Sequence, residues 1–249
     1  FGLYAMIAFP FSYIYTTAYS ESLFTFLLVL FFISIYRKNL FLLSFSSFFI
    51  SLTRPTACCI FPVLLIYVLR NHYGFNRKSF VCSLKNCVPI LSFFVGVGGL
   101  FSFYAWKFGD FLYFFTAQES WGNRLSSGFL WNNVSQAKIF FNNIIKEPFV
   151  LTRWSFDFLS NILLLFCVYK MWRWQRFYEA IFAICLFTLN SFKPYLSCAS
   201  RFVVVCFPIF LLVSKRGGSV FGRNLLLGSG LVIQVYFWVY FVLFIVPNP

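Results

Sequence analysis

The sequence predicts an all-α protein: a polytopic bundle of about nine transmembrane helices that forms a single domain over residues 1–249. Hydrophobic residues make up 61% of the chain, and aromatic residues alone make up 24%. Charged residues make up only 10%, whereas a soluble domain has about 25%. Because apolar runs separated by short polar clusters follow one another along the chain, most of its surface must face a lipid bilayer.

Apolar runs bounded by polar residues define the predicted spans. Several are shorter than the roughly 20 residues that a straight spanning helix needs, so we expect paired helices joined by tight turns. In chain order the spans are 1–18, 22–36, 40–53, 56–69, 87–105, 156–169, 177–190, 201–214 and 224–246. One long polar and aromatic loop, residues 106–155, separates the fifth span from the sixth, and loops of this length are usually functional or disordered. Its aromatic content favours a functional loop.

The basic residues orient the bundle. When the loops are assigned alternately to two sides, one side receives twelve of the twenty Lys and Arg residues, all in short loops. The positive-inside rule assigns that side to the cytoplasm. Of the six acidic residues, only Glu179 lies near a cytoplasmic end. The non-cytoplasmic side therefore holds or borders nearly all the acid, together with the long loop.

The remaining composition excludes several classes of protein. The net charge of +14 does not indicate nucleic-acid binding, because the basic residues lie in short clusters between apolar runs. The eight cysteines lie mostly inside apolar runs, without the CxxC pairs or nearby His of a zinc site, so we expect buried thiols that pack as small apolar groups. The sequence identifies no cofactor, and it leaves open whether the protein uses a divalent metal.

Polar residues at membrane depth are candidate functional residues because each charge costs roughly 2.5–3.5 kcal/mol on insertion scales. The first group is "YSESLF", with Tyr19 and Glu21 between the first two spans. The carboxylate of Glu21 can bind a sugar hydroxyl or hold a neighbouring arginine. Helix capping is an equally good interpretation, since "SES" before an apolar run is ordinary N-terminal capping sequence.

The second group is "SLTRPT", in which Arg54 lies in a turn between two short spans. Pro55 is expected to begin the next helix at its favoured first position. A guanidinium here can bind a phosphate through two hydrogen bonds. The alternative is an arginine that extends to the lipid headgroups.

Two further groups are assigned to the same side. "WKFGDFLYFFTAQESWG" contributes Asp110, Gln118 and Trp121, a mixture of carboxylate, amide and aromatic groups suited to a sugar. An aromatic belt at the membrane interface would use the same aromatic residues. "NSFKPYLSCASRF" contributes Lys193 and Arg201, which together can neutralise a phosphate.

The sequence contains none of several common catalytic and phosphate-binding motifs: it has no GxSxG, GxxxxGK[ST] or HExxH motif and no Ser/His/Asp set. No span carries the repeated charges of a pump or voltage sensor. Chemistry at a membrane face, on a membrane-embedded substrate, remains as the interpretation.

The motifs together, "FPFSYIYTTAYSESLF", "SLTRPTACCIFPVLLIYVL", "GDFLYFFTAQESWG" and "SCASRFVVVCFPIFLLVS", resemble the phosphatidylinositol-glycan class V family of mannosyltransferases. "LTRPT" and "AQESWG" are closer to the prokaryotic-type members. The resemblance implies the multi-helix GT-C architecture, and mannose transfer with inversion from a polyprenyl- or dolichyl-phosphate-mannose donor to a lipid-linked acceptor, as in glycosylphosphatidylinositol-anchor assembly. It also implies a multi-pass protein of a bacterial plasma membrane or of the endoplasmic reticulum.

The resemblance further implies a catalytic acidic residue in the first outer loop, a position that we expect to lie upstream of Phe1 in a chain truncated at its N-terminus. Arg54 and Arg201 are the candidates for binding the donor phosphate, and Glu21 and Asp110 for organising the sugar or those arginines. Two alternatives remain open: a transporter or flippase of lipid-linked sugars, and a catalytically incomplete membrane fragment. A transport path should need polar residues near the middle of several spans, and the second, sixth and ninth spans offer almost none.

Overall fold

The computed structural model describes residues 2–9, 20–72, 78–120, 153–192, 199–215 and 220–245, with residues 135, 138 and 142. Every element in these ranges is a helix. The α-helices are α1 (Gly2–Ile7), α2 (Glu21–Arg37), α3 (Leu40–Thr53), α4 (Ile60–His72), α5 (Lys78–Phe108), α6 (Tyr113–Ser120), α8 (Arg153–Arg173), α9 (Phe177–Ser191), α10 (Ala199–Val205), α11 (Pro208–Lys215) and α12 (Val220–Ile245). A short 3₁₀ helix, η2 (Pro55–Cys59), precedes α4. The predicted all-α class is confirmed for the described residues.

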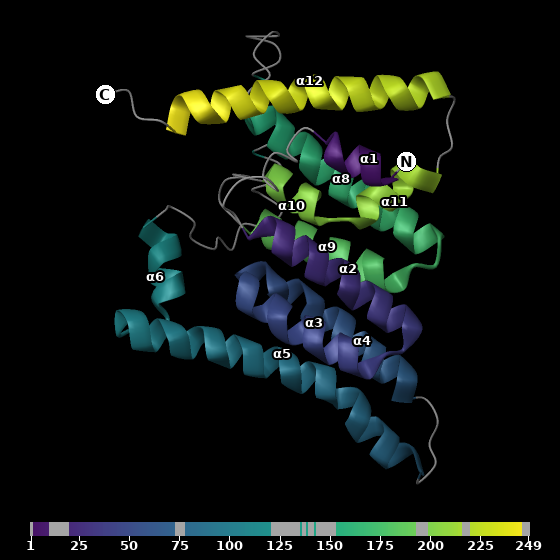
Figure 1. The fold of residues 1–249 in the computed structure, drawn as a ribbon, viewed down its shortest axis with the longest axis vertical. Coiled ribbons are helices and arrows are strands. Elements are labelled where there is room, and N and C mark those ends of the chain that lie inside the picture. The colour runs from purple at the N-terminus through teal and green to yellow at the C-terminus, as the bar shows by residue number, and fades with distance from the viewer. Residues whose placement is uncertain are drawn as a thin grey trace.

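Figure 1 shows α2, α3 and α4 side by side, with α5 crossing the outside of this layer. Helices α8 to α11 lie on the other side of α2, and α12 runs along that edge of the molecule. In Figure 1, α2, α3, α4 and α5 run alternately in opposite directions, as do α8 and α9, whereas α6 stands across the end of α5; the start of α2 lies near the ends of α3 and α9. Successive connections among α2 to α5 therefore lie at alternate ends of these helices.

The helix boundaries agree with most of the predicted spans. Asn39 begins α3 as an N-cap residue whose side chain accepts a hydrogen bond from the backbone N–H of Leu42 at 3.0 Å. Lys38, which separates α2 from α3, takes the left-handed conformation with φ of 52°, and its N–H bonds to the last carbonyls of α2. A turn of two residues, Lys38 and Asn39, therefore separates these two helices, as expected for paired helices.

Four predicted segments differ from the structure. In the first span, 1–18, helix α1 ends at Ile7, and Ala8 and Phe9 lie beyond it. The span 201–214 is two helices, because α10 ends at Val205 and α11 begins at Pro208, which has no N–H to continue a helix. The span 87–105 is part of the longer α5. The long loop begins after α5 ends, not at residue 106, and contains α6. Most of residues 121–152, and residues 10–19 of the first span, lie outside the described residues.

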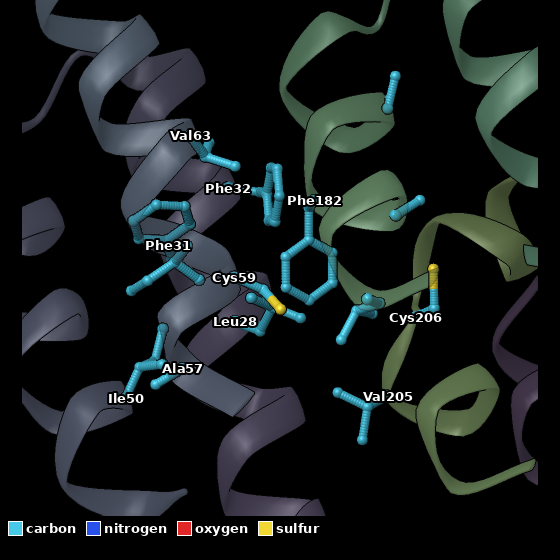
Figure 2. Packing of buried hydrophobic residues seen from close by; sticks show 14 of the residues in the cluster. Leu28, Phe31, Phe32, Ile50, Ala57, Cys59, Val63, Phe182, Val205 and Cys206 are labelled. Atoms are coloured by element: carbon cyan, nitrogen blue, oxygen red, sulfur yellow. The ribbon is translucent and has the colours of Figure 1, made fainter. Parts of the chain in front are cut away.

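Phenylalanine side chains build the core between the layers. Phe24, Phe31 and Phe182 are fully buried. The rings of Phe32 and Phe182 meet edge to face with centroids 5.8 Å apart, which joins α2 to α9. Figure 2 shows Phe182 pointing into the space between the layers, near Leu28 and Cys59. The expected burial of thiols is confirmed for Cys59, Cys167 and Cys206, whereas Cys58 and Cys87 are exposed.

One stretch of the described chain, Lys85–Phe108 in α5, is long and apolar enough to cross a membrane. Its surface carries exposed apolar side chains, including Leu91, Phe94 and Val95. The opposite face packs on α3 through Gly96, where a methyl group would lie 2.6 Å from the carbonyl oxygen of Phe48 and would also meet Ser51 Oγ. A glycine at this position therefore allows the two helix backbones to approach closely.

Replacing this glycine gives a test of the α3–α5 contact. Gly96→Ala should destabilise the fold by about 1–3 kcal/mol, because the backbone carbonyl of Phe48 must move to admit the methyl group. Gly98→Ala is the matched control on the same helix, since a methyl group there has nothing within 4 Å. The control should be neutral or stabilising, by up to about 1 kcal/mol, because alanine favours helix. Thermal unfolding in detergent gives the midpoint temperature of each variant. Equal midpoints for the two variants would contradict the close contact between α3 and α5.

Candidate functional site

Arg54 is positioned by the proline that follows it. Pro55 disfavours the helical conformation at the preceding residue, and Arg54 accordingly has extended backbone angles, φ of −158° and ψ of 149°. This ends α3 at Thr53, and Pro55 occupies the start of the 3₁₀ helix η2. The prediction that Pro55 begins the next helix is confirmed, with a 3₁₀ turn in place of an α-helical one.

Glu21 is the first residue of α2, and its side chain is completely buried. Its Oε1 lies 2.8 Å from Nη1 of Arg54, whose side chain remains 20% exposed. The pair joins the start of α2 to the junction between α3 and η2. Two of the four polar groups identified in the sequence, 33 positions apart by their numbers, are therefore in direct contact.

The ion pair shows that Glu21 holds a neighbouring arginine, one of the roles expected for it from the sequence. Ser20 occupies the N-cap position of α2 but makes no side-chain capping hydrogen bond, so the "SES" sequence does not cap through that serine. Glu21 turns its carboxylate to Arg54, although its position in the first turn also suits the helix dipole. Arg54 is held by this buried carboxylate and does not simply extend to the surface. The guanidinium is therefore held by the carboxylate, while the Arg54 side chain stays 20% exposed.

A buried amide pair lies in the same half of the bundle. Nδ2 of Asn190, near the end of α9, donates to Oδ1 of Asn161 on α8 at 2.9 Å. Both side chains are buried, Asn190 completely. Oδ1 of Asn190 has no hydrogen-bond partner among the described residues. The pair was not among the candidate residues identified from the sequence, and it places one buried polar side chain, Asn161, within the sixth predicted span.

Contacts between α2 and α9 show the depth of this amide pair. Tyr36 contacts Glu179, and Phe32 contacts Phe182, so the two helices run in opposite directions. Eleven residues separate Glu179 from Asn190, which corresponds to about 17 Å along a helix, and the fifteen from Tyr36 back to Glu21 correspond to about 22 Å. Asn190 therefore lies roughly one helical turn deeper in the bundle than Glu21.

The carboxylate of Asp110 bonds to residues that follow it in the chain and not to Arg54. Its Oδ1 accepts the N–H of Leu112 at 2.8 Å, and its Oδ2 lies 3.5 Å from Oγ1 of Thr116. The carboxylate is exposed and bonds within the turn that leads into the short helix α6. The register of α5 explains the separation, since Gly99 faces Leu52 and the helix continues for nine residues, about 14 Å, beyond that contact. Figure 1 shows α5 extending past the end of α3, with α6 at its tip.

The other predicted site residues are placed only in part. Arg201 lies on α10, which packs on α8 and touches α2 and α9, and Gln118 lies on α6, but neither side chain is described. Tyr19, Trp121 and Lys193 lie outside the described residues. The structure thus brings together Glu21 and Arg54, separates Asp110 from them, and adds Asn161 and Asn190 nearby.

Comparison with known proteins and metal-site geometry add little to this picture. No family model, curated protein or solved structure matches the chain. Within the described residues, His, Cys, Asp and Glu side chains form no group of three or more that could hold a metal ion. The features that bear on function are therefore the Glu21–Arg54 ion pair and the two sequence motifs that supply its partners.

Removing each partner of the ion pair should have unequal effects on stability. Arg54→Gln leaves the buried Glu21 carboxylate without its guanidinium and should cost about 3–5 kcal/mol. Glu21→Gln should cost less, because the Arg54 side chain is already 20% exposed and its charged group can be solvated. The double variant should lose less than the sum of the single losses. Denaturant unfolding in detergent gives the free energy of unfolding of each variant. If the loss in the double variant equals the sum of the two single losses, a direct interaction is contradicted.

Proposed function

We propose that this chain is an integral-membrane glycosyltransferase of GT-C type that transfers mannose from a polyprenyl- or dolichyl-phosphate-mannose donor to a lipid-linked acceptor. In this proposal the protein belongs to the phosphatidylinositol-glycan class V family. The site lies at the luminal or periplasmic face, around Glu21 and Arg54. The single observation that carries the proposal is their buried ion pair, at 2.8 Å.

This observation supports the proposal because the two partners come from the two sequence motifs on which the family resemblance depends. "YSESLF" supplies Glu21 and "LTRPT" supplies Arg54. The motifs lie at opposite ends of two successive helices, and the fold makes them contact each other. A shared function of the two motifs is a direct explanation of this contact.

The chemistry of an inverting transfer suits such an arginine. The bond between the anomeric carbon and the donor phosphate oxygen breaks, while the acceptor hydroxyl oxygen bonds to that carbon from the opposite face. The acceptor proton passes to a base, and the polyprenyl phosphate leaves with the bonding electron pair. A guanidinium offers several N–H donors in one plane, which match a phosphate and stabilise its growing negative charge.

Glu21 has a positioning role in this scheme. Its buried carboxylate fixes the orientation of the Arg54 guanidinium before the donor binds. It also offsets part of the cost of holding a cation in an apolar bundle. We assign the base to none of the described residues.

The placement in a membrane has separate support. Besides Lys85–Phe108, three shorter apolar helical stretches occur, Leu40–Thr53, Pro55–Arg70 and Phe177–Ser191. Large apolar side chains are exposed on several helices, such as Phe41 (80%) on α3 and Val232 (71%) on α12. Lipid contact explains such exposure better than water does.

The Asn161–Asn190 pair bears on the flippase alternative, because it is polar and lies inside the bundle. A polar path must present its groups to a passing substrate, whereas these two amides are buried and bonded to each other. The pair therefore fits a packing role between α8 and α9 better than a path. The transferase is the function that we favour.

The decisive experiment measures transfer of radiolabelled mannose from polyprenyl-phosphate-mannose in membranes that contain the full-length protein. Arg54→Lys should lower the rate at least about tenfold, because an ammonium cannot reproduce the planar set of donors that pairs with Glu21 and phosphate. Lys107→Gln is the control, an exposed cation in the last turn of α5, and should leave transfer unchanged.

Equal rates for Arg54→Lys and the unaltered protein, at equal membrane levels, would overturn the assignment of Arg54. Failure of the unaltered protein to transfer mannose, together with flux of the lipid-linked sugar across sealed vesicles, would overturn the transferase in favour of the flippase. Measuring both in the same vesicle preparation distinguishes these outcomes.

A further inference from the structure

The end of the bundle opposite Glu21 carries a concentration of positive charge. We call it the basic end and define it by six cations of the described residues, which come from the turns and helix termini at this side of the molecule. They are Arg37, Lys38, Arg70, Lys170, Arg173 and Arg176. Arg37, Lys38, Arg70 and Arg173 are exposed, and the other two are partly exposed.

Side-chain contacts hold four helix termini together at this end. Arg70, at the end of α4, lies over the rings of Phe177 and Tyr178 at the start of α9, 5.2 and 5.8 Å from their centroids. The ring of Tyr36 from α2 meets Tyr178 with centroids 6.4 Å apart. Trp172 from α8 meets Phe177 edge to face at 5.3 Å. The basic residues therefore belong to one surface.

The one carboxylate of this region is already neutralised. Glu179 is 1% exposed, and both of its oxygens lie 2.7 Å from the hydroxyl of Tyr36. Nη1 of Arg176 lies 3.1 Å from Oε1. No other acid occurs in the sequence between Glu21 and Asp110 or between Asp157 and Glu179. Six cations and one buried carboxylate leave a net charge of +5 at the basic end.

Aromatic side chains border these cations. Tyr169 and Trp172 are 56% and 60% exposed, and Tyr36 is 54% exposed. Nζ of Lys170 lies 5.5 Å from the centroids of Phe166 and Tyr169, so its stem runs along apolar surface. This arrangement is typical of helix ends at a membrane–water interface, where exposed Trp and Tyr lie beside Lys and Arg.

We propose that the basic end is a binding surface for anionic phospholipid headgroups of the leaflet that surrounds it. The turn between α2 and α3 and the end of α8 supply the cations that reach the headgroup phosphates. Arg176 and Arg70 are engaged with Glu179 and the aromatic rings and keep the helix termini in register. This proposal depends on the proposed membrane placement and is independent of the proposed transfer reaction.

The test reconstitutes the full-length protein in phosphatidylcholine vesicles and compares spin-labelled phosphatidylglycerol with spin-labelled phosphatidylcholine. Electron paramagnetic resonance gives the ratio of their association with the protein. The unaltered protein should prefer phosphatidylglycerol at least about twofold, and the preference should fall towards one in 1 M salt. The triple variant Arg37→Gln, Lys38→Gln, Arg173→Gln should also approach one, because it removes three of the four exposed cations and keeps both Arg70 on its aromatic rings and the contacts of Glu179.

Lys107→Gln is the matched control, because it removes an exposed cation from the other end of the bundle and should retain the preference. Equal lipid ratios in the unaltered protein, or an unchanged ratio in the triple variant, would overturn the proposal. So would binding of a labelled oligonucleotide to the unaltered protein that the triple variant loses, since the surface would then serve nucleic acid. Release of the protein from membranes by alkaline carbonate would overturn the membrane placement as well.

Discussion

The contact between Arg54 and Glu21 joins two helix ends that the chain leaves 33 positions apart, and it stabilises the arrangement of the first helices. A carboxylate with a fully buried side chain is costly unless a cation and hydrogen bonds compensate it, so α2 can begin at Glu21 only where Arg54 is within reach. Arg54 is within reach because Pro55 stops α3 and fixes an extended residue before it. One proline therefore sets the end of a helix and the position of the cation.

The same constraint acts elsewhere in the bundle. An apolar chain can bury a polar side chain only if another helix supplies its partner. Asn161 and Asn190 meet between α8 and α9, and Tyr36 and Arg176 enclose Glu179 at the other end of α2. Helix α2 is thus held at both ends by buried carboxylates, one of its own and one from α9. Its middle is held by phenylalanine packing, which fixes position less specifically than hydrogen bonds do.

The two ends of the bundle differ in the way they use charge. At the end with Glu21, the buried carboxylate balances Arg54, and exposed Lys107 and Asp110 lie near the tip of α5. At the basic end the cations are in large excess. An end with balanced charge and partly exposed Arg54 suits a specific anionic substrate, whereas an end with diffuse positive charge suits many weakly bound headgroups. This difference is the physical basis for assigning different partners to the two ends.

Apolar periodicity and punctuation in the sequence determined the all-α class and the approximate bounds of most helices, because the backbone of an apolar chain must satisfy its own hydrogen bonds. They also determined the turn at Pro55 and identified Glu21 and Arg54 as residues that needed explanation. The tertiary structure decided which of these residues meet, since the 2.8 Å contact and the displacement of Asp110 depend on helix register, which no local pattern contains. It also decided the pairing of Asn161 with Asn190, because an amide inside an apolar run shows its partner only when two helices pack.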